Sequence, residues 1–169
     1  MWDNKRDLEL KGKIWWDYVH EDLKELLSES LLLLEKVAHW EEKFHDYSFV
    51  VFPAAKAYEG FLKKLFLDLG FITQEDFYGK RFRVGKALNP ALPKRIREEE
   101  GVYDKIVEFC NGHELADRLW EAWKKCRNET FHWFPEEKNA ISLEESGQKV
   151  AMVIETMDLA FKECKVDIK

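Results

Sequence analysis

The stretch that decides the fold is Asp17–Phe44, which reads DYVHEDLKELLSESLLLLEKVAHWEEKF. Its apolar residues recur at steps of three and four, the period of one face of an α-helix. They are Val19, Leu23, Leu26, Leu33, Val37, Trp40 and Phe44. Ser30 interrupts this face without breaking it. The stretch therefore predicts one long amphipathic helix, and little elsewhere in the chain favours strands.

Three further long helices are predicted downstream. The second has Pro53 in its first turn, where proline is tolerated, and ends at Gly70, a common C-terminal cap. The third begins near Glu114 and must stop before Pro135, because proline cannot continue a helix. The last is opened by residues 142–145, Ser-Leu-Glu-Glu, which form a capping box. Its apolar stripe consists of Leu143, Val150, Val153, Ile154, Met157 and Phe161.

Residues 71–101, between the second and third main helices, differ from the rest because they are rich in turn-forming Gly and Pro. A short helix is expected to begin at Thr73, and another, Val102–Cys110, follows the segment. No acidic residue stands between Tyr78 and Arg97. The seven cations of the segment are Lys80, Arg81, Arg83, Lys86, Lys94, Arg95 and Arg97. We expect this loop-rich insertion to guide RNA by contacting its phosphates, the alternative being a solvated loop that offsets the acidic helices.

The chain as a whole is predicted to be one all-α domain, residues 1–169. Its four main helices would form an up-and-down bundle, with the basic insertion between the second and the third. A length of 169 residues with 46% hydrophobic residues is enough to bury the core of one such domain.

Composition also excludes several classes of protein. No apolar run approaches the roughly 20 residues needed to span a bilayer, so a membrane protein is excluded. The first residues carry no apolar signal-peptide core, and the three cysteines show no CxxC spacing. We therefore expect a cytoplasmic protein with reduced thiols. The net charge of −6 argues against a general nucleic-acid coat protein, so any RNA contact must come from local basic clusters.

Arg127 and His132 are the residues most suited to chemistry. Cleavage of RNA without a metal needs a group that exchanges protons near neutral pH, which histidine supplies. It also needs a fixed cation beside the phosphate, which arginine supplies, and Asn128 would hold a phosphate oxygen or the ribose hydroxyl. Five residues turn a straight helix by roughly 140°, so the two side chains would diverge unless the last turn before Pro135 is distorted. The alternative is an Arg and a His at a solvated helix end.

Two sequence blocks carry a resemblance to a known family. Arg127-Asn128-x-x-x-His132 resembles the R-x(4–6)-H signature of the HEPN superfamily, including the polar residue directly after the arginine. Residues 57–65, AYEGFLKKL, resemble a helix in the C-terminal catalytic domain of RNase LS-type toxins. The likeness spans roughly residues 45–165, and the order of the helices is also similar to that of the family.

The resemblance implies a homodimer in which two such motifs line one cleft. It implies a metal-independent toxin endoribonuclease that uses the ribose 2′-hydroxyl as nucleophile and leaves a 2′,3′-cyclic phosphate. His132 would be the acid/base, Arg127 would stabilise the pentavalent phosphate, and Glu59 would orient or tune them. Glu59 has an alternative role as a surface carboxylate paired with Lys56 or Lys63 at helical spacing.

The sequence departs from the family in two respects. RNase LS-type toxins carry additional N-terminal domains, so we expect either a fragment or a minimal stand-alone relative. HEPN toxins that are silenced by nucleotidyltransferase antitoxins resemble R-x4-H-x-Tyr, and here Phe134 takes the place of the modified tyrosine. We therefore expect a protein antitoxin that covers the cleft.

Metal binding is the main chemical alternative. Glu42-x-x-His45 and Glu129-x-x-His132 both have the E-x-x-H spacing of di-iron bundles. Those bundles hold their ligands in the bundle centre, whereas both stretches are expected at helix ends beside turns. We therefore expect no metal and no cofactor. The remaining histidines, His20, His39 and His113, are expected at the surface or in packing, and the cysteines in the core.

The sequence thus predicts a toxin-type endoribonuclease whose substrate is RNA. The alternative is a non-catalytic HEPN module that binds nucleotide, RNA or a partner protein. An exposed aromatic face, with Arg127 and His132 far apart in the dimer, would favour that module. A purely structural helical bundle is the third hypothesis.

Overall fold

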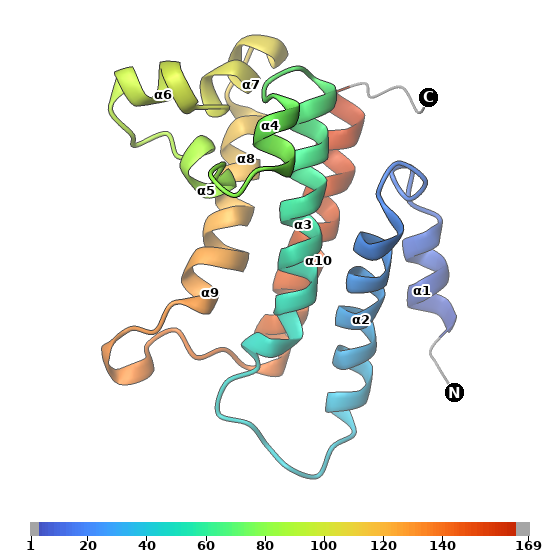
Figure 1. Cartoon of the computed structure of the whole chain (residues 1–169). Coiled ribbons are helices and arrows are strands. Elements are labelled where there is room, and N and C mark those ends of the chain that lie inside the picture. Colours follow the sequence, from blue (N-terminus) through green and yellow to red (C-terminus); the bar gives the residue numbers. More distant parts are fainter. Residues whose placement is uncertain (1–3, 165–169) are drawn as a thin grey trace.

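The computed structural model describes residues 4–164, apart from the side chains of residues 4–7 and 137. Within that range every regular element is a helix and no strand is present. In chain order the elements are α1 (Asn4–Lys11), α2 (Glu21–Ala38), α3 (Ser48–Asp68), α4 (Gln74–Tyr78), α5 (Val84–Ala87), α6 (Lys94–Glu100), α7 (Tyr103–Cys110), α8 (Glu114–Trp123), η1 (Lys124–Asn128), α9 (Glu129–Phe131), η2 (Pro135–Glu137) and α10 (Leu143–Glu163). The long helices α2, α3 and α10 pack together as a bundle, with α8 against α10 (Figure 1). The expected all-α helical bundle is confirmed.

Helix α3 begins earlier than the sequence suggested. Pro53 lies inside the helix, not in its first turn, which corrects the prediction. A proline in a helix interior disturbs the backbone hydrogen bonds around it. Here Ser30 of α2 compensates: its buried hydroxyl donates to the Val50 carbonyl at 2.8 Å and accepts from the Ala54 N–H at 2.9 Å. The serine that interrupts the apolar face of α2 therefore holds the irregular turn of α3.

Helix α2 is shorter than the predicted Asp17–Phe44. It ends at Ala38, so Trp40 and Phe44 lie in the following loop and not on the helix face. Their rings pack on one another at 5.7 Å between centroids, and Phe44 also contacts Tyr47 and Phe49. The Phe44 N–H donates to the Tyr47 hydroxyl at 3.1 Å. Contacts among aromatic residues within the loop, rather than helical periodicity, thus account for the apolar residues after Ala38.

Helix ends determined by local capping were predicted correctly. Gly70 adopts a left-handed φ of +72° directly after α3. Thr73 and Asp76 form a capping box at the start of α4, and Ser142 and Glu145 form another at the start of α10. The hydrogen bonds from Thr73 and Ser142 lower the pKa of the Asp76 and Glu145 carboxyls below their ordinary values. The predicted helix 102–110 is also confirmed as α7.

The third predicted helix runs as α8, η1 and α9 and stops before Pro135, as expected. Its middle part, η1, is a π-helical turn in which the Glu129 N–H donates to the Lys124 carbonyl, five residues back. The Lys125 carbonyl of this wider turn accepts hydrogen bonds from side chains. Its donors are the Thr130 hydroxyl at 2.8 Å and Lys149 Nζ at 2.6 Å. The helix is thus distorted at Arg127, one turn earlier than the distorted last turn before Pro135 that was considered from the sequence.

The segment before α2 contains α1, for which no helix was predicted. Trp15 is fully buried, and its indole N–H donates to Asp158 on α10 at 2.6 Å. Lys13 pairs with the same carboxylate, also at 2.6 Å. These contacts join the start of the chain to the end of α10. In the described part of the chain, no helix combines the length and apolar character that crossing a bilayer requires.

Candidate functional site

Arg127 lies in the π-helical turn η1 and faces α3. Its guanidinium lies 3.8 Å from the carboxylate of Glu59, and both side chains are 39% exposed. Helix α3 is held against α8 by Tyr58, whose buried hydroxyl donates to the Leu119 carbonyl at 3.1 Å. Burial raises the pKa of Tyr58 well above its ordinary value, so the hydroxyl remains a donor. The structure therefore brings Glu59 and Arg127 together, and Glu59 pairs with Arg127 rather than with Lys56 or Lys63.

Trp123 provides a surface beneath the arginine. The Arg127 guanidinium lies over its ring, 5.4 Å from the centroid, in a cation–π contact. The indole is buried, and Gly85 of α5 packs so closely on it that a Cβ at that position would overlap the ring nitrogen. Arg127 is thus confined on one side by Glu59 and on the other by a fixed aromatic ring.

His132 is the residue that ends α9. Its backbone is extended, at φ −100° and ψ 131°, and its side chain is exposed. The Asn139 side chain donates to the His132 carbonyl and, at 3.0 Å, to the Glu129 carbonyl. Asn139 thereby satisfies carbonyl groups that the end of a helix leaves without partners, and it fixes the position of His132.

A cavity of about 280 Å³ opens beside His132, and His45 also lines it. Its remaining lining residues are Asp46, Ser48, Thr130, Phe131, Trp133, Asn139 and Ala140. His45 comes from the loop between α2 and α3, which is far from His132 in sequence. The cavity therefore brings two histidines from separate loops to one small space.

Asp46 holds the His45 loop in place. Its carboxylate accepts from the Ser48 N–H at 3.0 Å, from the Ser48 hydroxyl at 2.7 Å and from the Ile141 N–H at 3.1 Å. The Tyr47 N–H in turn donates to the Ile141 carbonyl at 3.0 Å. The loop is therefore tied to the segment that leads into α10, next to Asn139.

Arg127 and the neighbour of His132, Phe131, contact different levels of α3. Arg127 pairs with Glu59, whereas Phe131, the neighbour of His132, packs against Phe52 at 5.5 Å between ring centroids. Phe52 and Glu59 are seven residues apart, which is roughly 10 Å along a helix. In the described part of the chain no hydrogen bond or ion pair joins Arg127 to His132. Asn128 is half-buried beside them, and its side chain forms no hydrogen bond to another described residue.

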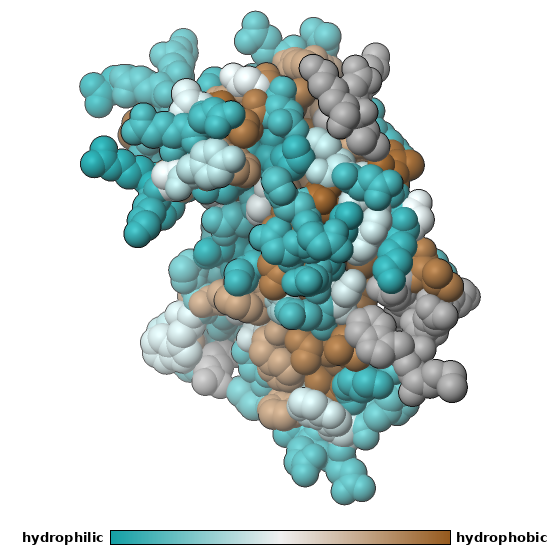
Figure 2. Space-filling model, turned by 45° about the vertical axis from the view of Figure 1, so that its right-hand side comes forward, coloured by the Kyte–Doolittle hydropathy of each residue, from teal (hydrophilic) through white to brown (hydrophobic). Residues whose placement is uncertain are grey.

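The surface around the cavity is rich in exposed aromatic residues. They belong to the segments that form the cavity or adjoin them in sequence, and they are Trp40, Phe44, Phe52, Trp133 and Phe134; Trp133 lines the cavity and is 72% exposed. On the face that Figure 2 draws, hydrophobic side chains gather in the half nearer the α2–α3 loop, whereas hydrophilic side chains dominate the end that carries α4–α7. We call these five residues the aromatic patch. Single exposed apolar residues are ordinary, but a patch beside a polar cavity is typical of a binding surface.

The basic segment 80–97 lies at the opposite end of the molecule (Figure 1). It contains the short helices α5 and α6 and is less loop-rich than expected. Three of its seven cations have carboxylate partners: Lys86 with Glu100 at 2.6 Å, Arg97 with Asp104 at 3.3 Å and Lys94 with Glu98 at 3.6 Å. The lack of acidic residues between Tyr78 and Arg97 therefore does not leave all seven charges without a counterion, because α6 and α7 bring acidic residues from later in the chain to the segment.

Four cations of the segment remain outside the ion pairs found among the described residues. Lys80, Arg81, Arg83 and Arg95 are exposed, and Arg83 donates to the Lys80 carbonyl at 3.1 Å. Their charge is available to solvent or to a polyanion.

The other titratable residues do not gather into a second site. Within the described residues, no three His, Cys, Asp or Glu side chains converge as a metal site would require. Cys126 and Cys164 are buried, as expected, and burial raises the pKa of their thiols to about 11 and about 12. Cys110 is only half-buried. His20, His39 and His113, which were expected at the surface or in packing, are exposed.

The sequence pointed to Arg127, His132 and Glu59, but not to His45 or Asn139 as parts of the same site. His45 attracted notice only as half of an E-x-x-H pair, and no local pattern places it opposite His132. Hydrogen bonds of Asp46 and Tyr47 to Ile141, nearly a hundred residues away, make that arrangement.

The chain was also compared with known proteins. No protein-family model matches it, and no curated protein or solved structure matches it at a significant level. The contacts of Glu59, Arg127, His45 and His132 therefore carry the functional argument.

Proposed function

We propose that this protein is a metal-independent endoribonuclease of the HEPN kind that acts as a toxin. The observation that carries the proposal is the Glu59–Arg127 pair on a π-helical turn that leads to His132 in a two-histidine cavity. π-Helical turns occur frequently at functional sites, because they reorient side chains at a cost in regular hydrogen bonding. The four main helices of the HEPN-like bundle would be α2, α3, α8 with its extension to α9, and α10.

The proposed reaction needs two proton transfers. One histidine takes the proton of the ribose 2′-hydroxyl while O2′ forms a bond to phosphorus. The second histidine gives its proton to the 5′-oxygen as the P–O5′ bond breaks. The products are a 2′,3′-cyclic phosphate and a 5′-hydroxyl, so no oxidant or other reactant is required. Within one chain His132 and His45 would share these two roles.

Arg127 would bind the phosphate as negative charge builds up on it. Glu59 and Trp123 restrict the guanidinium, so less conformational entropy is lost when the phosphate binds. Asn128, beside Arg127 in the turn, would hold a phosphate oxygen or the ribose hydroxyl. Arg127 and the residue before His132 contact different turns of α3. This separation favours a homodimer, in which a second copy brings its Arg127 toward the His132 of the first.

Further binding roles follow from the two ends of the molecule. The aromatic patch would stack on unpaired bases, and the exposed cations of segment 80–97 would contact RNA phosphates. A protein antitoxin would act by covering the cavity and the aromatic patch around it. Phe134 lies in this patch and has no hydroxyl to modify, which favours covering over covalent silencing.

The assignment of the site is tested with purified variants and an RNA substrate in EDTA. We expect Arg127→Ala and His132→Ala each to lower kcat at least 100-fold, since positioned acid/base and electrostatic groups contribute on that order. Arg118→Ala and His113→Ala are the matched controls, because both residues lie outside the site and should keep wild-type activity. Equal activity of all four variants would contradict the proposal.

His45 is tested by the pH dependence of the same reaction. Two histidines with opposite roles give a bell-shaped profile of kcat/KM, because each must be in a different protonation state. We expect His45→Gln to lose one limb of that profile and His132→Gln to lose the other. If His45→Gln keeps both limbs, the second histidine comes from the partner copy and His45 has no part in proton transfer.

A second candidate function is favoured by the aromatic patch. A non-catalytic HEPN module that binds nucleotide, RNA or a partner protein would use these exposed rings and would not need Arg127 and His132 to converge. RNA binding without cleavage, weakened by Trp133→Ala but not by His132→Ala, would support the module. Cleavage that depends on His132 would exclude it.

A further inference from the structure

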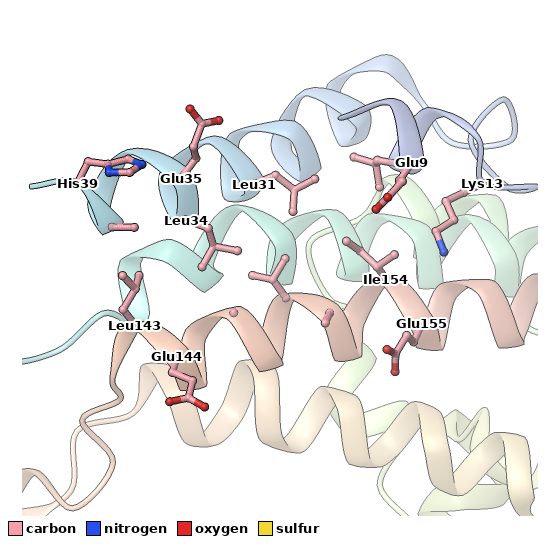
Figure 3. Close-up of a pocket in the computed structure, with 15 residues that line it drawn as sticks. Glu9, Lys13, Leu31, Leu34, Glu35, His39, Leu143, Glu144, Ile154 and Glu155 are labelled. Atoms are coloured by element: carbon pink, nitrogen blue, oxygen red, sulfur yellow. The ribbon is translucent and has the colours of Figure 1, made fainter. Parts of the chain in front are cut away.

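A groove of about 870 Å³ runs between α2 and α10, away from the cavity of His45 and His132. Figure 3 shows it with α2 along one side, α10 along the other and α1 at one end. The apolar side chains of Leu31 and Leu34 reach into it from α2, and Leu143 and Ile154 reach into it from α10. None of the four is fully buried, so the groove presents apolar surface to solvent.

The sequence of the two helices explains why the groove stays open. Its α10 side includes Gly147 and Ala151, and its α2 side includes Ala38, so short side chains stand where long ones would fill the space. A Cβ at Gly147 would meet only Leu34, at an ordinary 3.6 Å. Leu10 of α1 and Lys13, which follows that helix, line one end, and among the described residues no other element lines the groove. The lining residues of α10 recur at steps of three and four, as a stripe that receives another helix does.

The edges of the groove are acidic. Glu35 stands on the α2 edge, Glu144 and Glu155 on the α10 edge and Glu9 at the α1 end. Glu35 pairs with its neighbour Lys36, and Glu155 pairs with Arg118 at 3.8 Å. The lysine of the lining, Lys13, is already bound to Asp158, a carboxylate just outside the groove. An occupant that is apolar on one face and basic on its flanks therefore fits both the floor and the edges.

We propose that this groove binds an amphipathic basic helix of a partner protein. The lining of α10 runs from Leu143 to Glu155, which is roughly 18 Å along a helix and matches a ligand helix of about three turns. Among the described residues, Ala38 on one side of the groove and Ala151 on the other are exposed to solvent. An elongated open groove suits a helix that lies in it, whereas a small molecule is usually enclosed on most sides.

The probe for the test is a fluorescein-labelled synthetic peptide of about five helical turns, with Leu at positions i, i+3, i+4 and i+7 and Lys on its flanks. A second peptide has the same Leu residues but Glu in place of Lys. Binding to the whole chain is followed by fluorescence anisotropy, and the contact surface by hydrogen exchange. We expect the basic peptide to bind and to slow hydrogen exchange of the backbone amides of α2 and α10 that line the groove. Its affinity should fall as the salt concentration rises.

Variants identify the groove without disturbing the fold. Glu144→Gln with Glu155→Gln removes two edge charges and should raise Kd about three- to tenfold, the effect of two surface ion pairs. Glu99→Gln with Glu108→Gln removes two exposed charges elsewhere and should leave Kd unchanged. Ala151→Trp places a large ring in the groove from an exposed position and should abolish binding.

Three results would overturn the proposal. Equal binding of the acidic peptide would show that charge does not select the occupant. Protection of the aromatic patch instead of α2 and α10 would place the peptide elsewhere. Slow hydrogen exchange in the groove when the protein is concentrated and no peptide is present would mean that a second copy of the chain fills the groove. None of these outcomes depends on RNA cleavage, so the proposal for the groove and the proposal for the nuclease site are tested independently.

Discussion

Ser30 illustrates how a single side chain can allow a proline inside a helix. Its hydroxyl is fully buried and bonded to both the Val50 carbonyl and the Ala54 N–H, next to Pro53. Buried backbone groups that lose their partners cost free energy, because water cannot replace the lost bonds. In the sequence, Ser30 only interrupts an apolar stripe. The local pattern of residues does not indicate that its hydroxyl bonds to α3.

Replacing Ser30 should therefore destabilise the fold. We expect Ser30→Ala to lower the free energy of unfolding by about 1–3 kcal/mol, since it leaves a donor and an acceptor unsatisfied. The measurement is urea denaturation followed by circular dichroism. Glu29→Ala, one residue earlier on an exposed position of α2, is the control and should change stability by less than about 0.5 kcal/mol. A Ser30→Ala variant as stable as this control would refute the role given to the serine.

Among the elements, the contact between α2 and α3 depends on a glycine. A Cβ at Gly60 would come within 2.6 Å of the Leu23 side chain, whereas a Cβ at Gly147 on α10 meets Leu34 at 3.6 Å. Both glycines lie inside long helices, so alanine at either position gains the same helix propensity. A difference in stability between the two alanine variants therefore reports the cost of packing at Gly60, because the gain in helix propensity is the same in both.

We expect Gly147→Ala to raise the free energy of unfolding by about 0.5–1 kcal/mol, the gain in helix propensity. The free energy of unfolding of Gly60→Ala should be lower than that of Gly147→Ala by at least about 1 kcal/mol, because overpacking at a helix contact typically costs about 1–3 kcal/mol. Thermal and urea unfolding of the two variants provide the comparison. Equal stabilisation by both substitutions would show that α2 and α3 can move apart without cost.

The elements that the sequence predicted well are those set by neighbouring residues. The capping boxes at Thr73 and Ser142 and the left-handed Gly70 involve contacts within a few positions, so their pattern is readable. The elements that were missed depend on distant partners. The π-helical turn is stabilised in part by Lys149 of α10, and the segment after α1 is held by Asp158. Nothing in the residues of η1 or α1 indicates these bonds.

At the scale of the whole molecule, an acidic chain carries the basic segment 80–97 at one end and its aromatic patch toward the other. The proposed RNA path would join these two ends, passing Arg127 in the middle. The sequence identified the cations, Glu59, Arg127 and His132, because each belongs to a short motif or a charge run. It did not reveal the ion pairs of α6 or the cavity partner His45, because both arise only when separate segments meet.

The contribution of the basic end is measurable through salt dependence. Arg81→Gln with Arg95→Gln removes two cations that have no carboxylate partner among the described residues, and RNA affinity should fall. The slope of log K against log salt should decrease by about 1.4, since each contact with a single-stranded phosphate contributes about 0.7. Lys36→Gln with Lys162→Gln, outside the segment, should leave the slope unchanged. A slope that both double variants alter equally would contradict an RNA path over α5 and α6.

The central claim is that His132 takes part in metal-free cleavage of RNA. Its most direct test is to incubate a defined RNA with wild type and with His132→Ala in EDTA and to analyse the termini of the products. The account predicts fragments that end in a 2′,3′-cyclic phosphate with wild type and intact RNA with His132→Ala. Intact RNA with both proteins, or the same cyclic products with both, would contradict it.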